Sequence, residues 1–223
     1  MGTFLVLQDA VLDQRFGSAR RTTVKRVINA QIAALWGAYP WAFKRRPPAS
    51  VTVVASTRDL TLTAITNVEP IEEVLGLFND DGDPLTALPN DEFEDLYEQS
   101  HMQGDTGDPE SFTVYEGDGS LLNVRLGPTP SAAATYKMVY NAGPPTLSAD
   151  ADDLATFGWP ATHHELVIVS ARIQMTQDEN DGTWRELEPA RKRLLDAMVD
   201  VMTEDDGGTT REFGADLLGY ELV

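Results

Sequence analysis

The spacing of the apolar residues changes twice along this chain, and those changes limit the folds that it can adopt. An early group recurs at helical spacing: Val24, Val27, Ile28, Ile32, Leu35 and Trp36. Such a stripe covers one face of a helix, so we expect a helix over SARRTTVKRVINAQIAALWGAYPW. Thr22 or Thr23 suits its N-cap, and Gly37 with Pro40 suits its end.

From residue 51 the apolar residues alternate with polar ones, which is typical of β-strands. Strands are expected over 51–56, 60–66, 71–79, 111–116, 120–126 and 134–143. Asp81-Gly82 and the segment 117–119 have the composition of hairpin turns. A short acidic helix is expected over 90–101, with Asn90 as its cap and with Phe93, Leu96 and Tyr97 on one face.

Helical spacing returns in the last third of the chain. It predicts helices over 162–178 and roughly 183–202, and the stripe Leu166, Val169 and Ile173 indicates that the first of them packs in a bundle. The sequence therefore predicts an α+β fold, an α-helical bundle interrupted by an antiparallel β insertion and followed by an extended C-terminal arm. The expected divisions are a helical segment at 1–46, a β-rich insertion with one short helix at 47–145, further helices at 146–203 and the arm at 204–223.

Charge is unevenly distributed in this chain of 223 residues with a formal net charge of −19. Residues 1–46 hold eight basic side chains and two acidic ones, whereas residues 59–124 hold seventeen acids and neither Lys nor Arg. An acidic middle repels phosphate, which argues against tight wrapping of nucleic acid. It is either a solvated surface or a lining past which DNA moves without being held. A basic helix and an acidic middle also suit head-to-side contacts between copies, which give rings when they close.

The chain contains no cysteine, which excludes disulfides, thiolate metal sites and cysteine nucleophiles and fits a reducing cytoplasm. No apolar run approaches the ~20 residues that a membrane-spanning helix needs. The start, MGTFLVLQDAVLDQRF, lacks the basic residues and the cleavage site of a signal peptide. We therefore expect a soluble protein that is made inside the cell and does not contact a membrane.

The stretch GWPATHHELVIVSARIQ, residues 158–174, is the candidate for chemistry because His163, His164 and Glu165 are adjacent in it. A zinc-binding helix needs two histidines one turn apart, and neighbouring imidazoles diverge by about 100° on a helix. Thr162 and Glu165 instead have the spacing of a capping box. We therefore predict the start of a helix here, with no metal, no cofactor and no catalytic residue.

Other signatures of catalysis or of metal binding are weak. The chain has no nucleophile elbow, no Walker A loop and no dinucleotide-binding glycine triplet. Carboxylates are so abundant that a hydrolase with an acid pair stays a minor hypothesis. The segment 80–83 resembles a calcium loop in composition but lacks its spacing, so a turn is favoured. The aromatic residues Trp36, Tyr39, Trp41 and Phe43 suit a core or a subunit interface better than a stacking platform. The protein is not expected to be an enzyme.

The order of several segments resembles the head–tail connector adaptors of tailed bacteriophages. The segments are VINAQIAALWGAYPWAF, DEFEDLYEQ, ESFTVYEGDGSLLNVRLGPTPSAAATYKMVYNAGPPTLSADADDL and WPATHHELVIVSA, which together span about residues 20–200. The loops at 79–84 and 104–110 and the C-terminal tail have no counterpart in that pattern. The resemblance implies a structural protein of the virion without catalytic activity.

Further expectations follow from this resemblance. Such adaptors form a ring, usually a dodecamer, in the neck between capsid and tail, after assembly in the host cytoplasm. The ring lies under the portal protein and extends the DNA channel toward a tail-side stopper, tail terminator or tail tube protein, and DNA passes without specific binding. An alternative function is a β-rich tail or baseplate module that binds a glycan or a partner protein.

Candidate site residues fall into three sets. The arm that would dock on the portal carries Phe213, Leu217, Leu218 and Tyr220. The candidate subunit interface is Arg20, Arg21, Lys25, Arg26, Trp36 and Trp41. The candidate channel lining is Glu72, Glu73, Asp91, Glu92 and Asp95.

Overall fold

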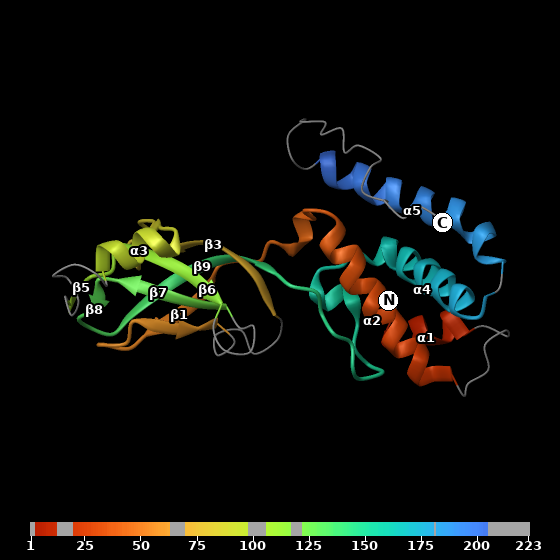
Figure 1. Ribbon diagram of the computed structural model, residues 1–223, viewed down its shortest axis with the longest axis horizontal. Helices are drawn as coiled ribbons and strands as arrows, with labels where there is room; N and C mark the ends of the chain where they lie inside the picture. The colour runs from red at the N-terminus through yellow and green to blue at the C-terminus, as the bar shows by residue number, and fades with distance from the viewer. Residues whose placement is uncertain are drawn as a thin grey trace.

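A computed structural model of the chain describes residues 3–12, 20–62, 70–97, 106–116, 122–180 and 182–204. Most helices gather in one part of an elongated molecule and the strands in the other (Figure 1). The α-helices are α1 (Phe4–Leu12), α2 (Arg21–Ala38), α3 (Asn90–Tyr97), α4 (His164–Asp178) and α5 (Trp184–Glu204). The strands are β1 (Ala49–Val53), β2 (Asp59–Thr61), β3 (Ile71–Phe78), β4 (Thr86–Ala87), β5 (Thr106–Gly107), β6 (Ser111–Glu116), β7 (Leu122–Gly127), β8 (Thr129–Pro130) and β9 (Ala134–Ala142).

Helix α2 confirms the predicted apolar stripe, because all six of its residues are buried. The helix ends at Ala38, and Tyr39 after it is extended. The predicted cap is wrong: α2 begins at Arg21, and Arg20 at the N-cap makes no side-chain capping bond. Thr22 and Thr23 therefore lie inside the first turn, where both are exposed.

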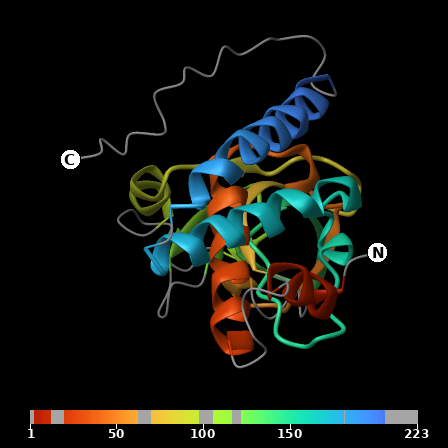
Figure 2. The same cartoon turned by 90° about the vertical axis from the view of Figure 1, so that its right-hand side faces the viewer.

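Four helices pack together in the helical part. Figure 2 shows α4 crossing α2, with α1 on one side of α4 and α5 on the other. Helix α1 was not predicted, since its sequence FLVLQDAVL carries apolar residues on every side, and these obscure the helical spacing of the buried ones. It buries Phe4, Leu7 and Val11 against the core and leaves Leu5 and Val6 exposed.

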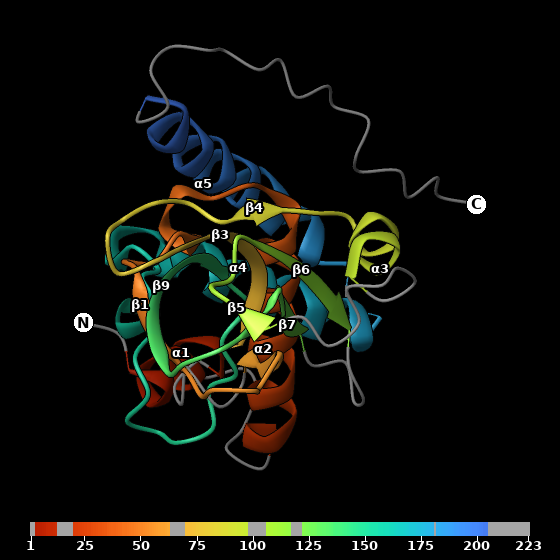
Figure 3. The ribbon, with the colours of Figure 1, turned by 90° about the vertical axis from the view of Figure 1, so that its left-hand side faces the viewer.

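The β part contains three sheets, in the orders β1-β9-β3, β2-β7-β6-β4 and β5-β8. Figure 3 shows β1 and β9 on one side of this part and β6 and β7 on the other. The α+β class is confirmed. The longer strands pair antiparallel as expected, but β4 with β6 and β5 with β8 are parallel pairs. Part of the predicted strand 60–66 and residues 205–223 of the predicted arm lie outside the described residues.

The turn after β3 and the helix after β4 match most of what the sequence predicts for them. Gly82 has a φ of 90°, and its N–H donates to the Asn79 carbonyl at 3.0 Å, so the turn is confirmed. In α3, Phe93 is buried whereas Leu96 is 44% exposed. Asn90 is the first residue of α3, and its side-chain amide donates to Glu94.

The chain enters and leaves the β part at neighbouring residues. Arg45 and Asn141 form an isolated antiparallel bridge, and the Arg46 N–H donates to the Tyr140 carbonyl at 3.0 Å. The Arg46 guanidinium also donates to the carbonyl oxygens of Phe43 and Phe157. The bridge and the Arg46 N–H bond attach the segment that leads into the β part to β9, the strand that leads out of it. The bond to Phe157 attaches the same segment to the 3-10 turn Leu154–Phe157.

Candidate assembly surfaces

Trp36 and Trp41, two of the candidate interface residues, are in the core. Trp36 is 0% exposed and Trp41 3%. The Trp36 ring lies 5.1 Å from that of Phe43 and 6.1 Å from that of Trp159, measured between centroids. The Trp41 indole N–H donates to the Leu35 carbonyl at 2.7 Å. In this packing neither indole is accessible to a second copy. Of the two roles expected for these aromatic residues, a core or a subunit interface, the core is therefore the one that Trp36 and Trp41 have. Trp159 joins this cluster from a distant segment, which the sequence did not indicate.

The cations at the start of α2 are mostly paired within the chain. Arg20 forms an ion pair with Glu179 at the end of α4. Arg21 pairs with Asp9 of α1 at 2.8 Å, and Lys25 pairs with Asp150 at 2.9 Å. Arg26 is exposed and has no ion-pair partner in the described part of the chain.

These pairs bring three segments that are distant in the sequence onto one helix. The hydrogen bond from Lys25, together with one from Gln8, holds the pKa of the Asp150 carboxyl below its ordinary value. Exposed pairs of this kind contribute little each. Counting charges along α2 therefore overstates the positive charge that a neighbouring copy would meet.

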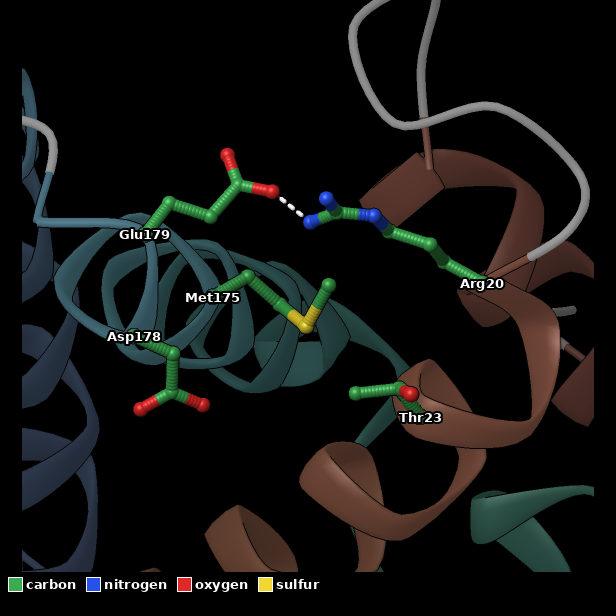
Figure 4. A pocket seen from close by; sticks show the side chains of 5 residues that line it. All are labelled: Arg20, Thr23, Met175, Asp178 and Glu179. Atoms are coloured by element: carbon green, nitrogen blue, oxygen red, sulfur yellow. Dashed lines mark ion pairs between the residues drawn. The ribbon is translucent and has the colours of Figure 1, made fainter.

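A pocket of about 590 Å³ lies between the start of α2 and the end of α4, lined by Arg20, Thr23, Met175, Asp178 and Glu179. In Figure 4 the Met175 side chain points between the two helices, and the ion pair of Arg20 with Glu179 closes one side. Met175 is 2% exposed. The walls thus combine an apolar side chain with one neutralised ion pair and one further carboxylate, Asp178, which accepts a hydrogen bond from Gln174.

The five candidate lining acids do not form one cluster. Glu72 pairs with Lys44 at 3.2 Å, and Glu73 accepts a hydrogen bond from the Asn141 amide at 2.9 Å. Both are on β3, in the three-stranded sheet. The other three acids are exposed on α3, which packs on β6 of a different sheet: Asp91, Glu92 and Asp95. Helix α3 lies at the end of the β part farther from the helices (Figure 1).

The histidine pair is part of a helix start, but the predicted capping box is wrong. Residues Ala161–His163 form a 3-10 turn, and α4 begins only at His164. Neither turn nor helix has a side-chain capping bond at its N-cap, because the 3-10 turn places Thr162 inside it. The predicted stripe is confirmed, since Leu166, Val169 and Ile173 are buried.

His164 is buried and His163 half-buried, and burial lowers the pKa of both imidazoles below the ordinary value. The charge of Asp153 and a backbone hydrogen bond at Trp159 oppose that shift for His164. Its Nε2 has no hydrogen-bond partner among the described residues. Across the same residues, no group of three or more His, Asp or Glu side chains is arranged to hold a metal ion.

The four candidate portal-docking residues, Phe213, Leu217, Leu218 and Tyr220, lie outside the described residues. None of the described helices combines the length and the apolar character that crossing a bilayer requires.

Residues 3–212 match the family model described as SU10 adaptor protein. No curated protein matches the chain. The match spans the helical part, the β part and the segments that join them.

Proposed function

Since the chain belongs to the SU10 adaptor protein family, which is a family of phage head–tail adaptors, we propose that its copies form a ring under the portal. The ring extends the DNA channel toward the tail and joins capsid to tail in the neck of the virion. The family match over residues 3–212 is the observation that carries this proposal. The ring contains several copies, a dodecamer being the number that adaptors of this kind usually reach.

The distribution of charge supports a channel role. Like charge along a channel wall prevents DNA from adhering to it, and a formal net charge of −19 gives this chain an excess of acids. Asp91, Glu92 and Asp95 suit such a lining because they are exposed together on α3. Glu72 and Glu73 suit it less well, since each already has a partner within the chain.

The remaining contacts follow from the same role. We assign residues 1–46 and 146–203 to the body of each subunit, 47–145 to an inserted β part, and 204–223 to an arm that docks on the portal. Arg26 is the α2 cation best placed for a contact between copies, because it is exposed and, unlike Arg20, Arg21 and Lys25, has no ion-pair partner among the described residues. The tail-side partner is a stopper, a tail terminator or a tail tube protein. The protein acts in the virion as a structural component and not as an enzyme.

Electron microscopy of the purified chain, alone and mixed with the portal protein of the same phage, tests this proposal. We expect closed rings on their own or on the portal, and co-purification of the two proteins. A chain that stays monomeric and does not bind the portal would contradict it. Saturable binding of a glycan by that monomer would then favour the β-rich binding module.

A further inference from the structure

The two outer edges of the three-stranded sheet have no further described strand beside Tyr140 and Asn141 of β9. Farther along β3 the edge is covered, since the Leu85 N–H donates to the Leu77 carbonyl and Pro84 bridges Phe78. Strand β1 has β9 as its one neighbour among the described strands, and so does β3. Both pair antiparallel with β9, so β1 and β3 run parallel to each other on opposite edges of one sheet. Edges of this kind are where a second chain can pack.

The residues that are paired across the sheet at Asn141 carry opposite charges on its two edges. Arg45 bridges Asn141 from one side, and Glu73 is paired with Asn141 from the other. The Asn141 amide donates to Glu73 at 2.9 Å, which fixes the carboxylate at this level. Arg45 and Glu73 are both exposed, and Arg45 has no ion-pair partner in the described part of the chain. The sheet therefore has a cation at one edge and an anion at the other, at equal height.

The next level carries apolar residues on both edges. The pairing of β3 shifts between Val74 and Gly76, and the extra residue Leu75 is 43% exposed. On the other edge Pro47 and Pro48 lie between Arg46, which bonds to Tyr140, and Ala49, which is paired with Met138. Both prolines are exposed. The irregular residues of the two edges thus lie beside the same stretch of β9, Met138 to Tyr140.

We propose that the Arg45–Pro48 edge of one copy packs beside the Glu73–Leu75 edge of the next copy. Arg45 then meets Glu73 of the neighbour, and Leu75 meets the two prolines. If the neighbouring copy lies beside the first with its strands running in the same direction, Arg45 of one copy lies level with Glu73 of the next. This alignment is possible because β1 and β3 run in the same direction. Proline has no N–H to donate, so the contact is made by side chains and not by a continuous ladder.

This contact joins two different surfaces of the same chain, and a heterologous contact of that kind forms a ring when the rotation between copies closes. It rests on the proposed function, which requires a ring, and it names the strands that the ring brings together. It also differs from the α2 face, whose cations Arg20, Arg21 and Lys25 are already paired within the chain.

A cysteine pair tests the contact directly, because the natural chain has no cysteine. Arg45→Cys and Glu73→Cys are made singly and then mixed, and a short bis-maleimide links thiols that lie close together. We expect covalent dimers in the mixture and none in either single variant alone, since a heterologous contact brings residue 45 to residue 73. The double variant should give a ladder of covalent oligomers that ends at the ring. Arg45→Cys mixed with Lys192→Cys is the control, because Lys192 is an exposed cation on α5.

The outcomes separate this contact from the ring itself. Rings seen by electron microscopy without cross-linking of 45 to 73 would overturn the edge contact and leave the proposed function standing. A chain that forms no ring alone or on the portal, and no covalent ladder, would overturn both. Cross-linking within each single variant would show an isologous contact and would also overturn the inference.

Charge reversal supplies a second measurement that needs no cross-linker. Arg45→Glu and Glu73→Arg should each raise the concentration at half-assembly by about two- to fivefold, which is the range for one cross-strand charge pair. The double variant should return toward the natural value, because it restores opposite charges at the contact. Lys192→Glu should leave the midpoint unchanged. Equal effects of Lys192→Glu and Arg45→Glu would mean that only net charge matters.

Discussion

The indole N–H of Trp36 donates a hydrogen bond of 2.9 Å to the carbonyl oxygen of Ala142. Trp36 is near the end of α2, and Ala142 is the last residue of β9. Both residues are 0% exposed. A single buried bond thus connects the first long helix with the strand that carries the chain out of the β part.

Replacing Trp36 should show how much this bond and its ring contribute to stability. Trp36→Phe keeps a ring but leaves the Ala142 carbonyl without its donor, so we expect a loss of about 1–3 kcal/mol in the free energy of unfolding. Trp36→Ala should lose about 3–5 kcal/mol because it also empties the core. Denaturant unfolding measures both. Trp184→Phe is the control, as Trp184 is only half-buried, and an equal loss there would contradict the role given to Trp36.

Gly127 should not tolerate a side chain. A Cβ at this position would lie 2.5 Å from the Tyr97 ring, whose hydroxyl is bonded to Ser111 at 2.9 Å. Gly127→Ala should therefore cost about 1–3 kcal/mol. Gly37→Ala is the matched control: its Cβ meets nothing within 4 Å, and alanine in a helix is favoured over glycine by up to about 1 kcal/mol. Thermal unfolding should move in opposite directions for the two variants, and parallel shifts would argue against the close approach.

Stability should fall in mild acid because of His164. Its pKa in the folded chain is below the ordinary 6.5, so the unfolded chain takes up the proton first as the pH falls. Above about pH 6.5 the ionisation of His164 does not change the free energy of unfolding. As the pH drops below about 6.5 the free energy of unfolding decreases, and the decrease stops below the pKa of His164 in the folded chain. His164→Gln should flatten the decrease, and His163→Gln should flatten it less because that side chain is half-buried. Unfolding curves that keep the same slope in His164→Gln would contradict this assignment.

Deleting residues 207–223 should remove portal binding and leave the fold intact. The hydrophobic core of the described residues reaches no farther along the chain than Val199, so we expect an unchanged unfolding midpoint. Replacing Phe213, Leu217, Leu218 and Tyr220 by Ala keeps the length of the chain and should weaken binding equally. If the truncated chain is retained by immobilised portal protein as well as the full chain is, the arm does not dock there.

Neutralising acids on α3 should make the channel wall adhere to DNA. Glu92→Gln with Asp95→Asn removes two exposed charges, and we expect slower DNA ejection from particles that carry this variant. Glu186→Gln with Asp196→Asn is the matched control, because it also removes one first-turn Glu and one later Asp, from α5. Both pairs should change stability by about 1 kcal/mol at most. Equal ejection rates for the two variants would remove α3 from the channel lining.

Elements with a clear period were predictable from the sequence. The stripe of α2 lies on one face and β9 alternates along its length, so burial there follows directly from spacing. The predicted stripe of α4 is buried as well, but α4 also buries Val167, Ala171 and Met175 on other sides, because α1, α2 and α5 all pack against it. Helix α1 was missed because its apolar residues surround the helix. The predictions of the N-caps were wrong for another reason. Thr22, Thr23 and Thr162 have suitable side chains, but each lies inside the first turn of its helix or 3-10 turn.

The candidate surfaces were harder to predict because partners are distant in the chain. A tryptophan beside other aromatics has the same pattern in a core and in an interface, and only the fold brings Trp159 onto Trp36. The cations of α2 form a basic face in the sequence, yet Asp9, Asp150 and Glu179 reach three of them from other segments. The matched edges around Asn141 depend on sheet order, which no local pattern contains.

The bridge between Arg45 and Asn141 has a consequence for how such a protein can change over time. A chain that enters and leaves its β part at adjacent residues can lengthen, shorten or replace that part while the ends stay where the helices need them. The helical part can then keep its packing while the β part diverges to suit a different neighbour. Relatives of this chain should therefore differ most between these two residues and least in the helices that flank them.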